Sequence, residues 1–372
     1  MFPLIRHIDD VLPHIKDKPE IIVVDKGDYT VLNYVISTEN TFDNIYAREC
    51  RGIKFDKNGN IIARPFHKWF NIGQTAETQP NVIAHKFDEP HTIMPKLDGS
   101  MIHPVMINEQ IRLCTKMGIT DTSLQAEEFI FGKRDYQNLM ATTVKWGFTP
   151  CFEWTSNKNR IVLDYPQDDL VLLAIRDMHT GAYSSHQTLV DIGVIFDIPV
   201  VKRYNAFSSI HELMKVAKAL EGEEGFVVQF PDGDMVKAKS DWYCLRHHSR
   251  DLITQEYRVV QMILNEEIDD LIPMLLEDDI KKVHELEKFV EQRIEQTNLN
   301  IIDLYLYVEK KFNSKKTFAL SEFSKTLTSE QKSAMFSLMD GHKTGRELAI
   351  ETIRRATSKD SDWKEYKERF MN

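Results

Sequence analysis

Lys96 stands in the stretch KLDG, where Asp98 and Gly99 follow it at fixed spacing. A lysine amine attacks an electrophile only in its neutral form, whereas an isolated lysine is charged at pH 7. The Asp-Gly pair is also typical of a tight turn whose lysine points to water. From this motif alone, a reactive lysine and a solvated turn lysine both remain open.

The stretch EGFVVQFPDGDMVKAKS contains two apolar runs around a Pro-Asp-Gly turn. It predicts an antiparallel hairpin of strands 225–230 and 235–239. The expected register places Phe230 opposite Met235, which fixes every other pair along the two strands.

The same register gathers charged side chains on one face of the hairpin. Lys237 and Lys239 share a face by the two-residue period of a strand, and Glu224 lies two positions beyond Phe226 on that face. A slip of one residue would remove Glu224 from it. The alternative is a charged strand that faces solvent.

Glu153 lies in the middle of a strand-like run, Cys151–Trp154. A carboxylate in such a run is unusual unless it meets a cation, a metal or a hydroxyl, although an edge strand facing solvent also explains it.

Three further basic residues stand where they could hold phosphate groups. Arg51 is next to a glycine, Lys68 is followed by aromatic residues that include Phe70, and Lys116 stands in CTKMG. A guanidinium or an ammonium binds phosphate oxygens, and aromatic rings can pack beside it. Each residue taken singly is also consistent with a solvated side chain.

Glycine and proline usage indicates which elements position these residues. Twelve of 13 prolines and 13 of 15 glycines fall at or before Gly233. This part reads as short strands and turns with helices over 121–131 and 209–220, the first opening on an Asp/Ser cap pattern. We therefore expect an α+β domain of antiparallel sheets with helices over 1–246 and an all-helical domain over 247–372.

The helical domain is predicted from apolar residues that recur at i, i+3, i+4 and i+7. The periodic segments are 256–276, 280–296, 300–312 and 344–356. Residues 259–280 hold seven acids and no Lys or Arg, while 310–372 hold 14 Lys or Arg against nine Asp or Glu. The basic part is either a surface for RNA phosphates or a solvated helix face.

Composition limits the class of protein. The 372 residues carry a net charge of −10, which argues against a generally basic coat for nucleic acid. The four cysteines form no CxxC pair, and we expect reduced thiols in the cytoplasm. No signal peptide and no apolar stretch long enough to span a bilayer is recognised.

Taken in order, six blocks resemble the RNA ligase 1 family of T-even bacteriophages, within the covalent nucleotidyltransferase superfamily. The blocks are ECRGIKF, RPFHKWFN, KLDGS, FEWTSNKNRIV, EGFVVQ and VKAKSDWY. The resemblance covers roughly residues 40–245 and implies an adenylyltransferase domain followed by a helical domain that selects RNA.

The resemblance implies a role for each matching residue. Lys96 would attack the α-phosphate of ATP and carry AMP, while Lys237 and Lys239 would neutralise the phosphates during transfer. Glu153 would bind the nucleotide ribose. Glu224 would be associated with a divalent metal, expected to be Mg²⁺, and with lysine adenylation.

The remaining matches imply a nucleotide and phosphate pocket. Arg51, Lys68 and Lys116 would hold the triphosphate or the RNA 5′-phosphate, and Phe70 would belong to the same pocket. Gly99 would let the backbone approach the nucleotide. The surroundings of Lys116 depart from the family pattern, as does the apolar residue between Lys96 and Asp98.

The implied reaction joins RNA 3′-hydroxyl and 5′-phosphate ends through a lysyl-AMP and an adenylated RNA. The resemblance also implies single-stranded ends of a cleaved tRNA anticodon loop as substrate, healed beforehand by a polynucleotide kinase-phosphatase in the host cytoplasm. A DNA ligase or an mRNA-capping guanylyltransferase would share KxDG, but each appends an OB-fold where this chain is helical. A catalytically silent RNA-binding relative is a further alternative, although none of the catalytic lysines and carboxylates is missing.

Overall fold

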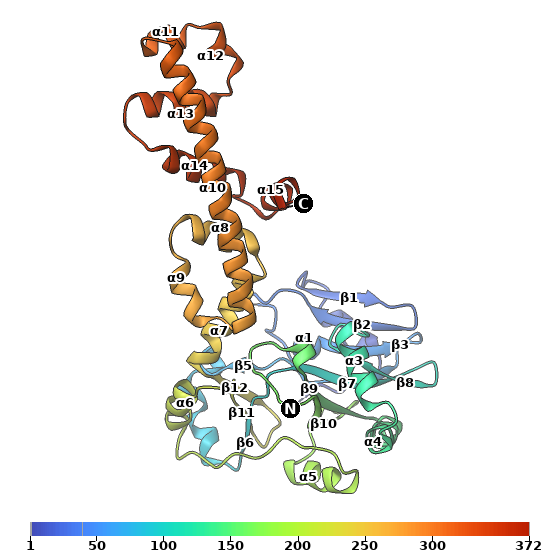
Figure 1. Cartoon of the computed structure of the whole chain (residues 1–372). Coiled ribbons are helices and arrows are strands. Elements are labelled where there is room, and N and C mark those ends of the chain that lie inside the picture. The colour runs from blue at the N-terminus through green and yellow to red at the C-terminus, as the bar shows by residue number, and fades with distance from the viewer. Residues whose placement is uncertain (1, 39, 372) are drawn as a thin grey trace. The chain divides into compact units, whose positions relative to one another are not determined.

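The computed structural model describes residues 2–38 and 40–371 (Figure 1). The chain forms two compact units, Met1–Cys244 and Leu245–Asn372, and the division falls within helix α7 (Asp241–Ile253). Within the described residues, no helix is both long enough and apolar enough to cross a membrane.

The first unit is built on three four-stranded sheets. The first has the order β1-β2-β3-β4, formed by Ile21–Asp25, Tyr29–Tyr34, Arg51–Asp56 and Ile61–Ala63. The second has the order β10-β9-β7-β8, formed by Asp169–Asp177, Phe148–Thr155, Ser100–Ile107 and Gln110–Cys114. The third has the order β5-β12-β11-β6, formed by Phe70–Asn71, Met235–Lys239, Gly225–Gln229 and Thr92–Pro95. All neighbouring strands are antiparallel except β5 and β12, so the predicted α+β class is confirmed.

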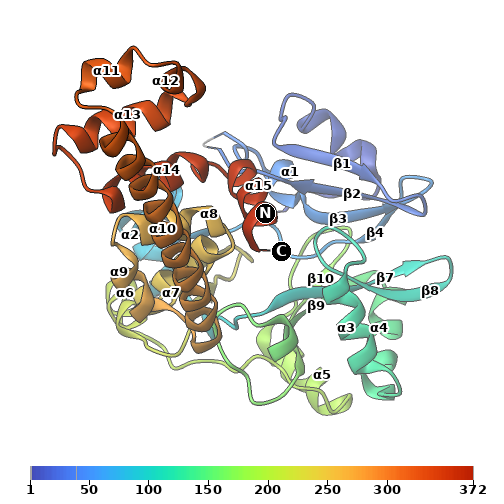
Figure 2. The ribbon, with the colours of Figure 1, turned by 45° about the horizontal axis from the view of Figure 1, so that its top comes forward.

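In the part of the first unit that the structure describes, six α-helices accompany these sheets. They are α1 (Ile45–Glu49), α2 (Pro80–Ile83), α3 (Asp121–Ile130), α4 (Arg134–Lys145), α5 (His186–Ile195) and α6 (Ile210–Ala219). The helices predicted over 121–131 and 209–220 are confirmed as α3 and α6; their first turns are capped by the side chains of Thr120 and Ser209. Figure 2 shows α3 and α4 beside the second sheet, where Leu139 packs into one apolar core with Phe152 and Trp154.

The hairpin of β11 and β12 is confirmed, but its predicted register is wrong by one residue. Gln229, rather than Phe230, lies opposite Met235. The reason is the loop: Phe230 N donates to the Asp234 carbonyl at 2.9 Å, so only three residues close the turn instead of four. Gly233, at φ +82°, supplies the left-handed conformation that such a three-residue loop requires.

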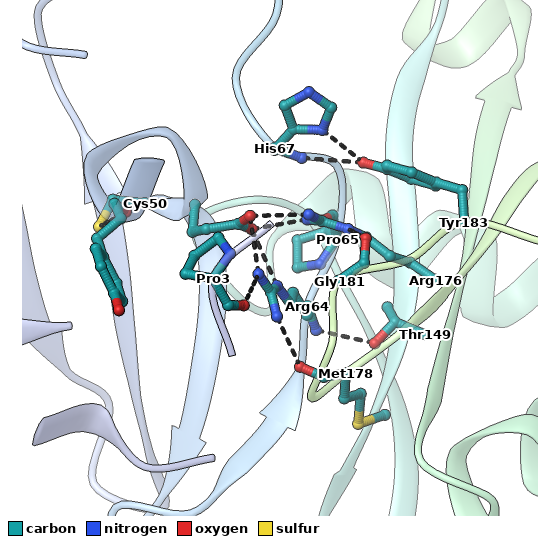
Figure 3. A network of polar contacts seen from close by, with 12 residues as sticks. Pro3, Cys50, Arg64, Pro65, His67, Thr149, Arg176, Met178, Gly181 and Tyr183 are labelled. Atoms are coloured by element: carbon teal, nitrogen blue, oxygen red, sulfur yellow. Dashed lines mark hydrogen bonds and ion pairs between the residues drawn. The ribbon is translucent and has the colours of Figure 1, made fainter. Parts of the chain in front are cut away.

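A buried charge network ties distant segments of the first unit together (Figure 3). Arg64, which follows β4, and Arg176, in β10, are both completely buried and both bind the Glu49 carboxylate at 2.8–2.9 Å. Their remaining donors reach backbone carbonyls, those of Pro3, Pro65, His179 and Gly181. The pair of guanidinium groups outweighs the cost of burial and lowers the pKa of Glu49 to about 2.

The second unit is helical throughout its regular structure. Its helices after α7 are α8 (Glu256–Leu264), α9 (Ile268–Leu271), α10 (Glu277–Lys311), α11 (Lys315–Ala319), α12 (Glu322–Thr326), α13 (Ser329–Met339), α14 (Gly345–Ala356) and α15 (Asp360–Met371). The segments predicted separately over 280–296 and 300–312 form one continuous helix, α10, because the intervening Thr-Asn-Leu contains no helix breaker. Two apolar cores lie along α10, one including Val290 and Trp363 and the other including Val308 and Phe318.

Candidate active site

Lys96 stands at the junction of two sheets. Strand β6 ends at Pro95, and β7 begins at Ser100, so the KLDG loop joins the third sheet to the second. The Lys96 amide donates to the Gly225 carbonyl at 2.8 Å, which extends the pairing of β6 with β11 by one residue. The loop therefore holds Lys96 beside the hairpin predicted to carry the other catalytic lysines.

Glu224 contacts two of these lysines. Its carboxylate is buried and lies 2.8 Å from Lys96 Nζ and 2.9 Å from Lys239 Nζ. With the corrected register, strand alternation would turn Glu224 away from Lys239, but Gly225 adopts φ +136° and breaks the alternation. A Cβ at Gly225 would lie 2.0 Å from the Ala238 carbonyl oxygen, so only glycine fits there.

A cavity of about 240 Å³ lies in front of this cluster. Its charged lining residues are Arg51, Lys68, Lys96, Glu153, Lys237 and Lys239. Its apolar lining includes Met94, Met101, Leu173, Val201, Val227 and Met235. The structure thus brings six of the predicted charged residues to one cavity whose other walls suit a flat apolar group such as a purine base.

Burial and crowding of like charges shift two groups of the cavity. Burial, and then the neighbouring Lys96 and Lys239, lower the pKa of Lys237 to about 7. Burial, and then the Glu224 carboxylate, raise the pKa of Glu153 to about 7, against the opposing effect of Lys96. Both groups therefore change charge near neutral pH.

Three polar groups of the cavity lack hydrogen-bond partners in the part of the chain that the structure describes. Arg51 Nη1 and Trp69 Nε1 are buried without a hydrogen bond. No hydrogen bond from a described residue reaches the Glu153 carboxylate, which is 9% exposed. Unpaired buried polar groups are costly, so these atoms are placed for a polar ligand.

Lys68 and Lys116 share an aromatic residue that sequence reasoning missed. Their Nζ atoms lie 4.8 and 5.3 Å from the Tyr34 ring centroid, and Tyr34 lines the cavity. Burial raises the pKa of Tyr34, but the charges of Lys68, Arg51 and Lys116 outweigh it and lower the pKa overall. No charge or turn flanks Tyr34 in its strand, so no local pattern marked it as a site residue.

Phe70, Lys116 and Glu224 lie behind or beside the cavity lining. Phe70 is buried in β5, and Lys68 Nζ lies over its ring, 5.4 Å from the ring centroid. Lys116 adjoins the cavity residues through the Tyr34 ring and through Gly52, where a Cβ atom would lie 2.7 Å from the Lys116 Cα.

Asp98 anchors the loop that carries Lys96. Its buried carboxylate accepts from the Tyr243 hydroxyl at 2.6 Å and from the amides of Val162 and Leu163 at 2.7 Å. At Gly99 the backbone lies close to that of Trp154 in β9, because a Cβ at Gly99 would lie 2.3 Å from the Trp154 carbonyl oxygen. Both residues therefore fix the loop against β9 and its following segment.

Residues 49–243 match the model of the RNA ligase family, and this span contains every residue of the cavity except Tyr34. The chain belongs to the RNA ligase family. The predicted resemblance to phage RNA ligase 1 is confirmed. Membership of this family identifies the protein as an enzyme that joins RNA. The family match also favours RNA ligation over the DNA ligase and capping alternatives.

Relatives of the ligase carry the same description. A protein of Thermovibrio ammonificans named as a candidate RNA ligase is 28% identical over 288 residues, which cover 74% of this chain and 73% of that protein. RNA ligase 1 of bacteriophage TS2126 is 25% identical over 260 residues, covering 66% and 62%. Among solved structures, an archaeal ATP-dependent RNA ligase aligns with a TM-score of 0.46 at 14% identity, covering 78% of this chain and 80% of that one. A Naegleria gruberi RNA ligase with pyrophosphate aligns with a TM-score of 0.40 at 16% identity, covering 49% and 57%.

Proposed function

We propose that the ligase uses ATP and joins RNA ends through a covalent AMP on Lys96. The observation that carries this proposal is the position of Lys96 Nζ in a cavity that also holds Arg51, Lys237 and Lys239 and is backed by Glu224. A lysine amine among cations and beside a carboxylate is the arrangement needed for attack on a polyphosphate.

In the first step, the neutral Lys96 amine attacks the α-phosphorus of ATP. A nitrogen–phosphorus bond forms, and the bond to pyrophosphate breaks. Glu224, at 2.8 Å, is within reach to accept the proton that the Lys96 ammonium must lose. Arg51, Lys237 and Lys239 offset the negative charge that accumulates on the phosphates and on the leaving pyrophosphate.

The later steps use the same cavity. The RNA 5′-phosphate attacks the AMP phosphorus and releases Lys96, giving an adenylated end. The RNA 3′-hydroxyl then attacks the 5′-phosphate and displaces AMP. Glu153 lines the cavity and accepts no hydrogen bond from a described residue, which supports a role as acceptor for the ribose of the nucleotide.

The donor set fits a weakly protein-bound Mg²⁺. Glu224 offers a carboxylate, but both of its oxygens bind lysines in this structure. The described residues contain no group of three or more His, Cys, Asp or Glu side chains that could hold a metal by themselves. Mg²⁺ would therefore be held by Glu224, phosphate oxygens and water, and when bound it supplies positive charge to the phosphates.

We further propose that the unit over residues 247–372 selects the RNA and that residues 1–246 perform the chemistry. The excess of basic residues in 310–372 supports an RNA-facing surface. The resemblance to phage RNA ligase 1 supports cleaved tRNA anticodon loops as the substrate, a kinase-phosphatase as the preceding enzyme, and the cytoplasm, that of the host for a phage protein, as the location.

The test is the covalent adduct. We expect wild-type protein with ATP and Mg²⁺ to gain the mass of AMP, and Lys96→Ala or added EDTA to prevent it. Arg134→Ala, which changes an exposed charge at the start of α4, should leave the adduct unchanged. A folded, nucleotide-free wild type that gains no mass refutes the proposal, and an adduct formed from GTP in preference to ATP replaces ligation with capping chemistry. Competing 5′-phosphorylated RNA and DNA strands then show which polymer is sealed.

A further inference from the structure

Lys54, in β3, is a completely buried lysine that the reaction above does not use. Its Nζ donates to the Gly52 carbonyl at 2.8 Å and to the Thr115 carbonyl at 3.1 Å, and it lies 2.9 Å from His103 Nε2. No carboxylate among the described residues forms an ion pair with it. Burial lowers the pKa of Lys54 to about 8, because a charged amine loses its hydration at this position.

The three contacts of Lys54 reach segments that carry three of the predicted site residues, Arg51, Lys116 and Lys96. Gly52 follows Arg51 directly, and Thr115 directly precedes Lys116. His103 lies in β7, the strand that begins where the KLDG loop ends. One amine therefore joins the first sheet, the second sheet and the turn after β8.

The backbones of Gly52 and Lys116 already touch at this point. Gly52 adopts φ +93°, and a Cβ there would lie 2.7 Å from both the Cα and the carbonyl oxygen of Lys116. Contact alone does not stop two segments from sliding past each other. The Lys54 hydrogen bonds to Gly52 and Thr115 fix their relative position on the buried side of the crossing.

His103 completes the cluster without adding charge. It is completely buried, and burial together with the charges of Lys54 and Arg51 holds its pKa well below the usual range. Its Nδ1 meets no hydrogen-bond partner among residues 2–38 and 40–371. The neutral ring therefore binds Lys54 on one side only, and the amine rather than the imidazole links the segments.

We propose that Lys54 is a positioning residue that holds Arg51 and Lys116 at the spacing required by the phosphate groups of the substrate. The inference rests on the proposed function, because it assumes that these two residues bind phosphates. Lys54 itself does not contact substrate in this proposal, since its side chain is completely buried and does not line the cavity.

The test is ATP binding in a background that cannot react. In Lys96→Ala protein, we expect Lys54→Met to weaken ATP binding by about tenfold or more in calorimetric titration, because methionine keeps the volume and loses all three contacts. Tyr136→Phe is the matched control: it removes a buried side-chain donor, 3.0 Å from the Leu170 carbonyl, away from the cavity. That variant should bind ATP within about twofold of its parent even if its melting temperature falls equally.

A double-mutant cycle separates positioning from general stability. If Lys54 acts through Lys116, then Lys54→Met should cost less than about threefold once Lys116→Ala is present. Full additivity, or a loss no larger than that of Tyr136→Phe, overturns the inference. Should Lys54→Met fail to fold, Lys54→Gln is judged by the same limits. A wild type that forms lysyl-AMP sustains the proposed function whatever these variants show, whereas a wild type that neither binds ATP nor forms the adduct refutes the function itself.

Discussion

The Lys96 ammonium and the Glu224 carboxylate form an ion pair of 2.8 Å, and the second oxygen of the same carboxylate binds Lys239 at 2.9 Å. The carboxylate is 2% exposed, so water screens the pair poorly. This contact orients Lys96, the proposed nucleophile, next to the carboxylate that we propose as the acceptor of its proton.

Glu224→Gln should slow formation of lysyl-AMP by about 100-fold or more, because an amide cannot accept the Lys96 proton. Single-turnover measurement of the AMP adduct by intact mass gives the rate. Glu223→Gln, at the adjacent exposed glutamate, is the control and should react like wild type. Equal rates for the two variants would exclude Glu224 as the proton acceptor.

Gly225→Ala should both destabilise the protein and disable adenylation. A Cβ at φ +136° meets the Ala238 carbonyl at 2.0 Å, so the backbone must move and carry Glu224 away from the lysines. We expect a loss of about 2–4 kcal/mol in the free energy of unfolding. Gly222→Ala also has a positive φ, of +77°, but meets no atom within 4 Å, and it should cost only about 1 kcal/mol. A Gly225→Ala protein of wild-type stability and adduct rate would show that the conformation is not required.

ATP binding should weaken as the pH rises through about 7. Lys237, whose pKa is about 7, is charged below that pH and neutral above it, and only the charged form attracts phosphate. In the Lys96→Ala background, loss of the neighbouring Lys96 charge moves the midpoint to a higher pH. Above that midpoint we expect a loss approaching tenfold per pH unit, with proton uptake on binding seen by calorimetry in two buffers.

Lys237→Arg provides the control for this pH dependence, because a guanidinium stays charged throughout the range. It should flatten the profile markedly. Glu153 also ionises near pH 7, and its negative charge repels phosphate, so it too weakens ATP binding as the pH rises. Glu153→Gln should therefore remove the pH dependence that remains in Lys237→Arg. A profile unchanged in both variants would assign the titration to neither group.

The Glu49 network should set the acid stability of the first unit. The pKa of Glu49 is about 2 in the folded protein against 4.5 as its ordinary value, so the stabilisation is complete above about pH 5 and lost as the pH falls through 2. Glu49→Gln leaves Arg64 and Arg176 buried without a counter-charge and should cost about 3–5 kcal/mol at pH 7. Urea unfolding of both proteins between pH 7 and pH 3 measures this. Asp28→Asn, which breaks an exposed ion pair with Lys57, should leave the urea unfolding curve close to that of wild type at each pH.

Local patterns in the sequence predicted much of this molecule correctly. Turn chemistry located the hairpin of β11 and β12, and helices were expected where α3, with its cap pattern, and α6 lie. Helical periodicity located α14 and, as two segments, α10. The six ordered blocks contain a set of charged residues that line one cavity in the structure: Arg51, Lys68, Lys96, Glu153, Lys237 and Lys239. These features are encoded within a few residues of each other or by a family pattern.

The features that could not be predicted depend on single backbone conformations or on remote partners. The register followed from a three-residue loop at Gly233, and the contact of Glu224 with Lys239 followed from the φ of Gly225. The pairing of Glu49 with Arg176 joins residues 127 positions apart, and no periodicity marks either of them. Tyr34 was missed for the same reason, since its cationic neighbours come from other strands.

The continuous helix α10 has a consequence for how the second unit opens. The helix has 35 residues, about 52 Å at 1.5 Å per residue, and Ile301 packs against both apolar cores. A break in its middle would expose apolar surface from each core at once. Amide hydrogens on either side of Ile301 should therefore exchange with deuterium at similar rates, as one cooperative block.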